Sequence, residues 1–205
     1  MALVNRVALV SRVKRILLQP NAEWAVIDTE LMNTATLYKT YIIPLAAIAP
    51  VCGAIGWTVF GVSLPFTGTI RLPLTTALTN AAIGYALALV GVFVFALIID
   101  ALAPSFSGQR NQVQALKVAA YSFTASWVGG VFTLVPALSI IALLGSLYSL
   151  YLLYAGLSPL MKAPKDKAVP YAIVVILVGI VLFVLLSAVR MAFLPSMAGL
   201  GGFRM

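Results

Sequence analysis

The sequence predicts an all-α, polytopic membrane protein: a bundle of five transmembrane helices preceded by amphipathic helices at the membrane surface. Hydrophobic residues make up 62% of the 205 residues and charged residues only 9%, against roughly a half and a quarter in soluble domains. Five apolar runs are each long enough to cross a bilayer, because ~20 helical residues span ~30 Å. The Lys and Arg residues gather at the ends of these runs, as the topology of membrane proteins requires.

Residues 1–36 are predicted to form a cytoplasmic amphipathic segment. Within it, residues 3–18 place apolar side chains at helical spacing, with Arg12 and Arg15 on the opposite face. This pattern is typical of a helix that lies on the membrane with its cations among lipid phosphates. The sequence Gln19-Pro20-Asn21 is expected to end this helix.

A second short helix is expected after this break, with Asn21 as its N-cap. Trp24 is predicted to be an interfacial anchor. Three of the five carboxylates in the chain form a cytoplasmic acidic segment just before the membrane: Glu23, Asp28 and Glu30. We expect this segment to face the basic residues Lys162, Lys165 and Lys167.

The membrane domain is expected to cover residues 37–194, with an outer tail at 195–205. Its five spans are predicted at residues 37–60, 77–102, 113–135, 137–156 and 169–194. The third and fourth spans follow each other almost without a linker, so they should form a hairpin and pack side by side. The segments 61–76, 103–111 and 156–167 are expected to be loops because they are rich in turn residues and charges.

Several prolines and glycines interrupt the predicted spans. Pro44 and Pro50 should kink the first span, because each removes a backbone donor. Pro136 lies at the turn between the third and fourth spans. Gly129 and Gly130 allow close helix packing. A gate or hinge at these positions is the alternative to kinks and packing.

Tyr148, Tyr151 and Tyr154 are spaced by three residues and therefore lie near one face of the fourth span. At headgroup depth such tyrosines form an aromatic belt that anchors the helix. A ligand site built on the same residues is the alternative interpretation.

The distribution of cations predicts that the N-terminus is inside and the C-terminus outside. With this orientation the outer segments carry three cations, Arg71, Arg190 and Arg204, and the inner segments carry the other ten of the 13. Cytoplasmic segments carry an excess of Lys and Arg in membrane proteins. The inner cations are Arg6, Arg12, Lys14, Arg15, Lys39, Arg110, Lys117, Lys162, Lys165 and Lys167.

The residue inventory argues against an enzyme. The chain has no His and one Cys, so it offers neither a Ser-His-Asp triad nor an HExxH zinc site. A Ser122–Lys117 dyad is disfavoured because residues five apart point about 140° away from each other around a helix. We therefore expect no catalytic residues, no metal site and no cofactor. The cations are explained by anionic lipid headgroups at the inner leaflet rather than by nucleic acid.

One polar cluster is a candidate functional site at the inner end of the bundle: Asp100, Arg110, Lys117 and Tyr121. Ionisable groups at membrane depth are costly unless paired, and they often mark a pathway. Asp100 is either the negative member of this cluster or an interfacial residue that faces water and helps to end the second span. The sequence leaves both interpretations open.

The order of several motifs resembles the bacterial inner-membrane branch of the Ypt-interacting-protein (Yip) family. The motifs are Pro20-x-x-x-Trp24, Asp100-x-Leu-Ala-Pro-x-Phe-x-Gly108, Ala115-Leu-Lys-x-x-Ala-Tyr-Ser122, Pro136, Tyr148-x-x-Tyr151-x-x-Tyr154-x-Gly156 and Leu160-Met161-Lys162. The family pattern has a proline shortly after Tyr-Ser, whereas this chain has none between Tyr121 and Ala125. The resemblance implies five spans with the N-terminus inside. Eukaryotic relatives are linked to small GTPases and vesicle traffic, but no segment of this chain reads as a GTPase-binding motif.

These observations favour a non-enzymatic protein of the bacterial inner membrane that acts as a scaffold, a lipid-organising element or a partner-binding subunit. The expected partners are membrane lipids and either another membrane protein or further copies of the chain. The alternative is a small transporter or channel with a polar inner mouth around Asp100 and Lys117. The two hypotheses differ in the interior between the spans: a wet polar cavity that reaches Asp100 favours transport, and a dry interior favours a scaffold.

Overall fold

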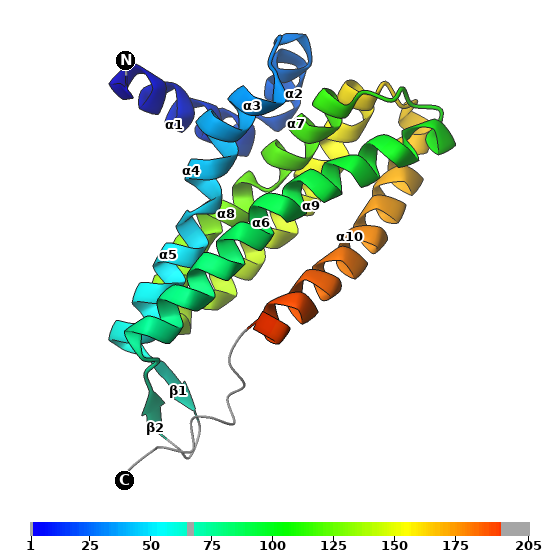
Figure 1. Cartoon of the computed structure of the whole chain (residues 1–205). Helices are drawn as coiled ribbons and strands as arrows, with labels where there is room; N and C mark the ends of the chain where they lie inside the picture. The colour runs from blue at the N-terminus through cyan, green and yellow to red at the C-terminus, as the bar shows by residue number, and fades with distance from the viewer. Residues whose placement is uncertain (1, 65–67, 194–205) are drawn as a thin grey trace.

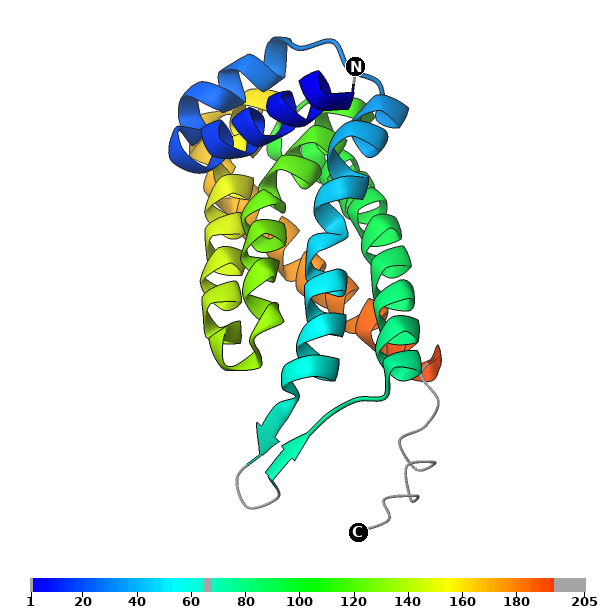
Figure 2. The same ribbon diagram turned by 90° about the vertical axis from the view of Figure 1, so that its left-hand side faces the viewer.

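The computed structural model describes residues 2–64 and 68–193, so Leu194 and the predicted outer tail lie outside the described residues. Long helices run side by side as an elongated bundle, and two N-terminal helices lie across one end of it (Figures 1 and 2). We call this end the surface-helix end. The opposite end, where a short β-hairpin projects, is called the hairpin end.

The N-terminal segment folds into α1 (Ala2–Leu18) and α2 (Pro20–Thr29). Pro20 occupies the first turn of α2, where its missing N–H costs no hydrogen bond. Gln19 is the N-cap residue, with no side-chain cap, so the predicted capping role of Asn21 is wrong. Asn33 instead caps the next helix, because its side chain accepts a hydrogen bond from the Thr36 amide.

The first span is continuous but irregular, and its irregularities lie next to its prolines. A π-helical turn precedes Pro44, and the α-helix is interrupted at Ala47, three residues before Pro50. Both breaks follow from the backbone donors that proline lacks. The elements are α3 (Thr34–Leu37), η1 (Tyr38–Ile42), α4 (Ile43–Ala46), α5 (Ile48–Ile55) and η2 (Gly56–Phe60).

The predicted outer loop contains strands that the sequence analysis did not anticipate. Strands β1 (Val62–Leu64) and β2 (Gly68–Ile70) pair antiparallel, with Val62 opposite Ile70. Gly61 begins this hairpin with a positive φ of 72°, a conformation that only glycine adopts without strain. The membrane domain is therefore helical, with a small hairpin at one end.

The remaining long helices are α6 (Leu74–Leu102), α9 (Ser139–Met161) and α10 (Lys165–Phe193), and η3 (Ala103–Phe106) extends α6. Only residues 162–164 separate α9 from α10, so the predicted loop at 156–167 is wrong. The helices extend further because Lys162 adopts a left-handed conformation, with φ 55°, and makes the turn tight. The Gln109 amide donates to the Met161 carbonyl and joins the two loops at this end.

The predicted third span is broken rather than continuous. It consists of α7 (Gln112–Ser122), α8 (Thr124–Gly129) and η4 (Gly130–Leu134), followed by η5 (Pro136–Leu138). The break lies at Phe123, although no proline is present there. Four helical stretches of the described residues are therefore long and apolar enough to cross a membrane: Thr34–Phe60, Leu74–Phe106, Ser139–Met161 and Lys165–Ala192.

Residues 112–134 nevertheless run the length of the bundle. Helix α6 ends at the surface-helix end and α9 begins at the hairpin end, so the chain between them returns from one end to the other (Figure 1). It lies beside α9, and the two segments join at the hairpin end (Figure 2). The two predicted neighbours thus form a helical hairpin around Pro136.

Close packing and burial are not uniform along the bundle. A Cβ on Gly130 would lie 2.6 Å from the Cβ of Ala49, and a Cβ on Gly129 would lie 3.5 Å from the Cα atoms of Ala142 and Gly145. These glycines therefore bring helices together, as packing residues do. Residues 115–122 of α7 are all buried, so the densest core lies towards the surface-helix end.

Candidate functional site

Lys117 joins the N-terminal helices to the bundle. It lies in the middle of α7 and is 2% exposed. Its Nζ donates hydrogen bonds to the carbonyl oxygens of Ile27, at 2.9 Å, and of Glu30, at 2.6 Å. These carbonyls lie at the C-terminal end of α2, where the helix dipole favours a cation. Two backbone oxygens thus accept hydrogen bonds from a buried ammonium group.

A second set of charges fixes α1 to α2. Arg12 donates to Oε1 of Glu23, at 2.5 Å, and to Oε1 of Glu30. Arg15 donates to the other oxygen of Glu23, at 2.9 Å, and the Glu23 side chain is only 4% exposed. Burial lowers the pKa of Arg12, but the hydrogen bond to Glu30 and the negative charges of Glu30 and Glu23 outweigh it and raise that pKa above its ordinary value. Arg12 therefore stays charged, and it pairs with protein carboxylates rather than with the lipid phosphates we expected.

Aromatic rings fill the space beneath this ion-pair network. Trp24 meets Tyr121 edge to face, with ring centroids 6.2 Å apart, and Tyr41 lies 4.5 Å from Tyr121 on another side. The Arg12 guanidinium lies 5.9 Å from the Tyr121 ring, within the range of a cation–π contact. Trp24 is 1% exposed, so its predicted role as an interfacial anchor is wrong. It is a core residue, because α2 folds back onto the bundle.

A third contact ties α2 to the loop between α9 and α10. Asp28 accepts a hydrogen bond from Lys162, at 2.6 Å, and its carbonyl accepts another from Gln114, at 3.1 Å. The acidic segment therefore meets the predicted basic loop through Lys162. Lys167 donates instead to Ser107, at 2.7 Å, and the side chains of Glu23 and Glu30 pair with the arginines of α1.

Asp100 and Arg110 form a separate pair at the same end. Their closest approach is 3.2 Å, and the Arg110 side chain is 65% exposed. Lys117 and Tyr121 contact the N-terminal helices instead, so the four residues predicted as one polar cluster belong to two sites. The reason is the N-terminal segment, which covers Lys117 and provides its acceptors.

The three tyrosines of α9, Tyr148, Tyr151 and Tyr154, have different environments. Tyr148 is half-buried and donates a hydrogen bond to the Leu17 carbonyl, at 2.8 Å, which attaches α9 to α1. Tyr151 and Tyr154 are exposed. Their role as membrane anchors stays a prediction.

We call the set of contacts between α1–α2 and the bundle the docking junction: Arg12, Glu23, Trp24, Asp28, Glu30, Gln114, Lys117, Tyr121, Tyr148 and Lys162. No junction of this kind was predicted from the sequence: Lys117 and Tyr121 were grouped with Asp100, Trp24 and Tyr148 were assigned as membrane anchors, and Gln114 was not singled out. The available signal is that the basic residues 2–18 are followed directly by the acidic residues 20–30, because two adjacent segments of opposite charge can pair with each other. No group of three or more His, Cys, Asp or Glu side chains that could hold a metal ion occurs among residues 2–64 and 68–193.

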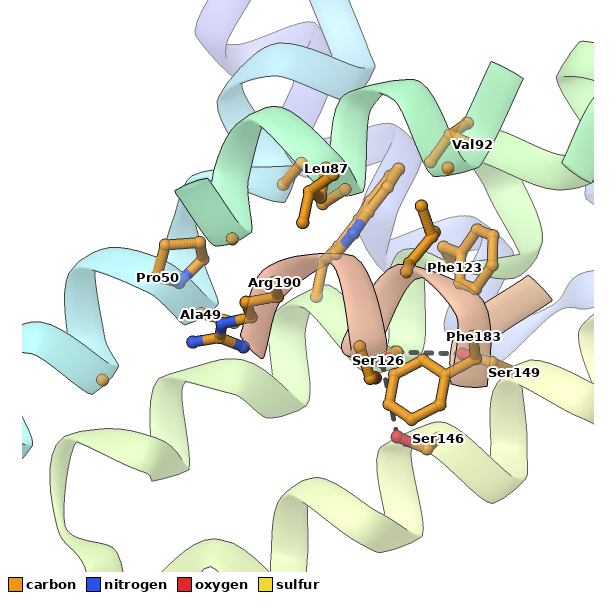
Figure 3. Close-up of a pocket in the computed structure, with 18 of the residues that line it drawn as sticks. Ala49, Pro50, Leu87, Val92, Phe123, Ser126, Ser146, Ser149, Phe183 and Arg190 are labelled. Atoms are coloured by element: carbon orange, nitrogen blue, oxygen red, sulfur yellow. Dashed lines mark hydrogen bonds between the residues drawn. The ribbon is translucent and has the colours of Figure 1, made fainter. Parts of the chain in front are cut away.

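A cavity of about 920 Å³ lies between the spans. Its lining comes from α5, α6, the 123–133 segment, α9 and α10, and is mostly apolar. Ser149 accepts a hydrogen bond from the Ser126 amide, and the Ser126 and Ser146 hydroxyls bond to each other (Figure 3). Within the described residues, Asp100, Lys117 and the other members of the predicted polar cluster do not line it.

A protein-family model, the Yip1 domain, matches residues 14–186. The chain belongs to the Yip1 domain family. The family indicated by the sequence motifs is therefore confirmed. The matched region contains both ends of the bundle and most of the docking junction. Arg12 precedes it and Arg190 follows it.

This Yip1-domain chain is also similar to curated proteins from two strains of Escherichia coli. The inner membrane protein YohC of strain K12 is 26% identical over 172 residues, which cover 82% of this chain and 88% of YohC. YohC of strain O6:H1 gives the same values. No solved structure was found to match the chain. Four helices among the described residues are long and apolar enough to cross a membrane, and the chain is similar to a protein named as an inner membrane protein. The chain is therefore a multi-pass inner membrane protein.

Proposed function

We propose that this Yip1-family protein is a non-enzymatic scaffold of the inner membrane, in which the docked α1–α2 pair forms a platform that holds a partner subunit or a second copy of the chain. The observation that carries the proposal is the docking junction. Ion pairs of Arg12 and Glu23 hold α1 to α2, and Lys117 of α7 and Lys162 of the α9–α10 loop fix this helix pair to the bundle.

The exposed side of α1 has the composition of a helix that lies at the membrane surface. Val10 and Leu18 are 67% and 68% exposed, and the exposed cation Lys14 lies between them in the sequence. The three positions are four residues apart and share one side of α1. Apolar side chains and cations on one face are typical of a helix in contact with lipid headgroups.

We further propose five crossings, with the N-terminus inside. Support for the count comes from residues 112–134, which must return from one end of the bundle to the other. Support for the orientation comes from the position of the cations. The surface-helix end carries Lys117, Lys162 and most other cations, and Arg71 and Arg190 lie towards the hairpin end. The positive-inside rule places the end with more cations in the cytoplasm.

The alternative, a small transporter or channel that opens at Asp100, finds less support. The cavity between the spans is mostly apolar and is not lined by Asp100 or Lys117. Lys117 is occupied by two carbonyl oxygens. A pathway for a hydrophilic solute needs polar groups along its length.

The test is purification of the full chain in a mild detergent, followed by native mass spectrometry. We expect a stoichiometric membrane partner or a homo-oligomer. The Lys117→Met variant, which releases the platform, should lower the recovered partner, and Lys165→Met, at an exposed position, should not. Repeated recovery of a lone monomer without bound lipid would contradict the scaffold proposal.

A further inference from the structure

The cavity between the spans is built from one face of each surrounding helix. On α6 the lining residues include Ala77, Ala81, Gly84, Ala88 and Gly91, which follow each other at spacings of four and three. Residues at these spacings share one side of a helix. These five positions form a stripe of small residues along α6, which leaves space between α6 and the helices opposite. The larger residues of α6 that also line the cavity are Asn80, Leu87, Val92 and Phe95.

Helix α10 closes the cavity only in part. It begins beside the end of α9 and ends beside the start of α6, so it crosses the bundle obliquely (Figures 1 and 2). Its lining residues Ile180 and Phe183 are exposed, and so are Leu143 and Leu147 on α9. The side between α9 and α10 is consequently open. In a membrane this opening faces the lipid chains.

Arg190 places a cation at one end of this apolar space (Figure 3). Its Nε donates to Oδ1 of Asn80, at 2.8 Å, and a terminal nitrogen donates to the same oxygen. Among the described residues, no carboxylate forms an ion pair with Arg190. Because a guanidinium has five N–H donors, several remain for another acceptor, and no carboxylate of residues 2–64 and 68–193 neutralises its charge.

The dimensions match one chain of a membrane lipid. The α10 residues that line the cavity extend from Ile176 to Arg190, which is about 21 Å along a helix at 1.5 Å per residue. One leaflet contributes about 15 Å of hydrocarbon, half of a core of ~30 Å. A ligand held at Arg190 thus has room to extend through the hydrocarbon of its leaflet.

We propose that the cavity binds a phospholipid from the leaflet at the hairpin end, with its phosphate on Arg190 and Asn80 and an acyl chain between α6, α9 and α10. Arginine suits a phosphate because its planar donors make paired hydrogen bonds. The hydroxyls of Ser126 and Ser146 bond to each other and do not disturb an apolar chain. This site goes beyond the proposed scaffold function, since it lies away from the docking junction and needs no protein partner.

Tryptophan fluorescence provides a direct test, because Trp127 lines the cavity and is only 7% exposed. The full chain in detergent micelles is titrated with phosphatidylglycerol that carries bromine on its acyl chains, which quenches nearby indoles. Trp57 also lines the cavity, so the comparison uses Trp57→Phe and the double variant Trp57→Phe/Trp127→Phe. Their difference isolates the Trp127 signal.

We expect brominated phosphatidylglycerol to quench Trp127. Arg190→Gln should raise the half-quenching concentration about tenfold, because it removes the charge-assisted hydrogen bonds to the phosphate. Arg71→Gln is the matched control: it removes one exposed cation in the hairpin-end loop that does not line the cavity, and it should change the value less than twofold. Ala88→Phe should weaken quenching by obstructing the cavity next to the small-residue stripe of α6, whereas Ala82→Phe, on an exposed position of the same helix, should not.

Four results would overturn the lipid site. The first is an unquenched Trp127. The second is equal half-quenching concentrations for Arg190→Gln and Arg71→Gln. The third is equal quenching by a brominated alkyl detergent without phosphate. The fourth is a dimer in native mass spectrometry that Ala88→Phe dissociates, which would mean that a second copy occupies the cavity. The arginine pair decides the matter even if the phenylalanine variants fail to fold.

Discussion

Replacing Lys117 by methionine should release the N-terminal helices from the bundle. The side chain is 2% exposed, and its ammonium donates two hydrogen bonds to the end of α2. A hydrogen bond to a charged group contributes about 1.5–3 kcal/mol, so the two together contribute at least about 3 kcal/mol. Methionine fills a similar volume but leaves both carbonyls without a donor. The docked state of α1–α2 should therefore lose roughly a hundredfold in its equilibrium constant.

Hydrogen exchange followed by mass spectrometry measures this opening directly, because amides of α2 exchange when the pair undocks. We expect the protection of α2 to fall by roughly a hundredfold, while amides of α6 keep theirs. Lys162→Met is the matched control. It removes a cation that also contacts α2, but the Lys162 side chain is 48% exposed, and exposed ion pairs contribute less than about 1 kcal/mol. If α2 in Lys117→Met stays within threefold of the wild type, the proposed role of the buried ammonium is wrong.

Three further predictions concern Glu23 in the docking junction, Gly156 against the Trp24 ring, and Asp100 in its pair with Arg110. Glu23→Gln should lower the protection of α2 in the same exchange assay by about 2 kcal/mol. This is less than the ~3–5 kcal/mol lost when a fully buried ion pair is broken, because Arg15 is half exposed. Unchanged protection would contradict this prediction. Gly156→Ala should destabilise the fold by about 1–3 kcal/mol through overpacking, because the new Cβ would lie 2.7 Å from the Trp24 ring, and this should appear as a lower melting temperature in detergent. Gly53→Ala should leave the melting temperature unchanged, because its Cβ would lie 3.8 Å from the nearest atom, Oγ1 of Thr133. Asp100→Asn should leave solute uptake into proteoliposomes unchanged, and a loss of uptake would favour the transporter.

Much of the site was not predictable because its partners come from distant parts of the chain. Lys117 binds a carbonyl 90 positions away, and Lys162 binds a carboxylate 134 positions away. Charge composition indicated that acidic and basic segments would meet, but not which residues would pair. Asp100 and Lys117 were grouped because both lie near the inner ends of spans, and the fold of α1–α2 separates them.

The helices themselves were largely predictable, and the differences lie at particular residues. The span at 113–135 breaks at Phe123 without a proline, so no residue type marked the break. The loop at 156–167 shortens because Lys162 adopts a left-handed turn. Trp24 was assigned to the interface from its residue type alone, and it is buried because α2 folds over Tyr121.

The sequence by itself determined that this chain lives in a membrane, where its apolar runs lie and to which family it belongs. Transfer of an apolar run into lipid is a sum over its own residues, so composition and length are sufficient to identify it. Only the tertiary structure decided which charges pair, that the N-terminal helices are docked, and that a cavity with Arg190 at one end lies between the spans. These features depend on the relative positions of distant segments, and no local pattern encodes them.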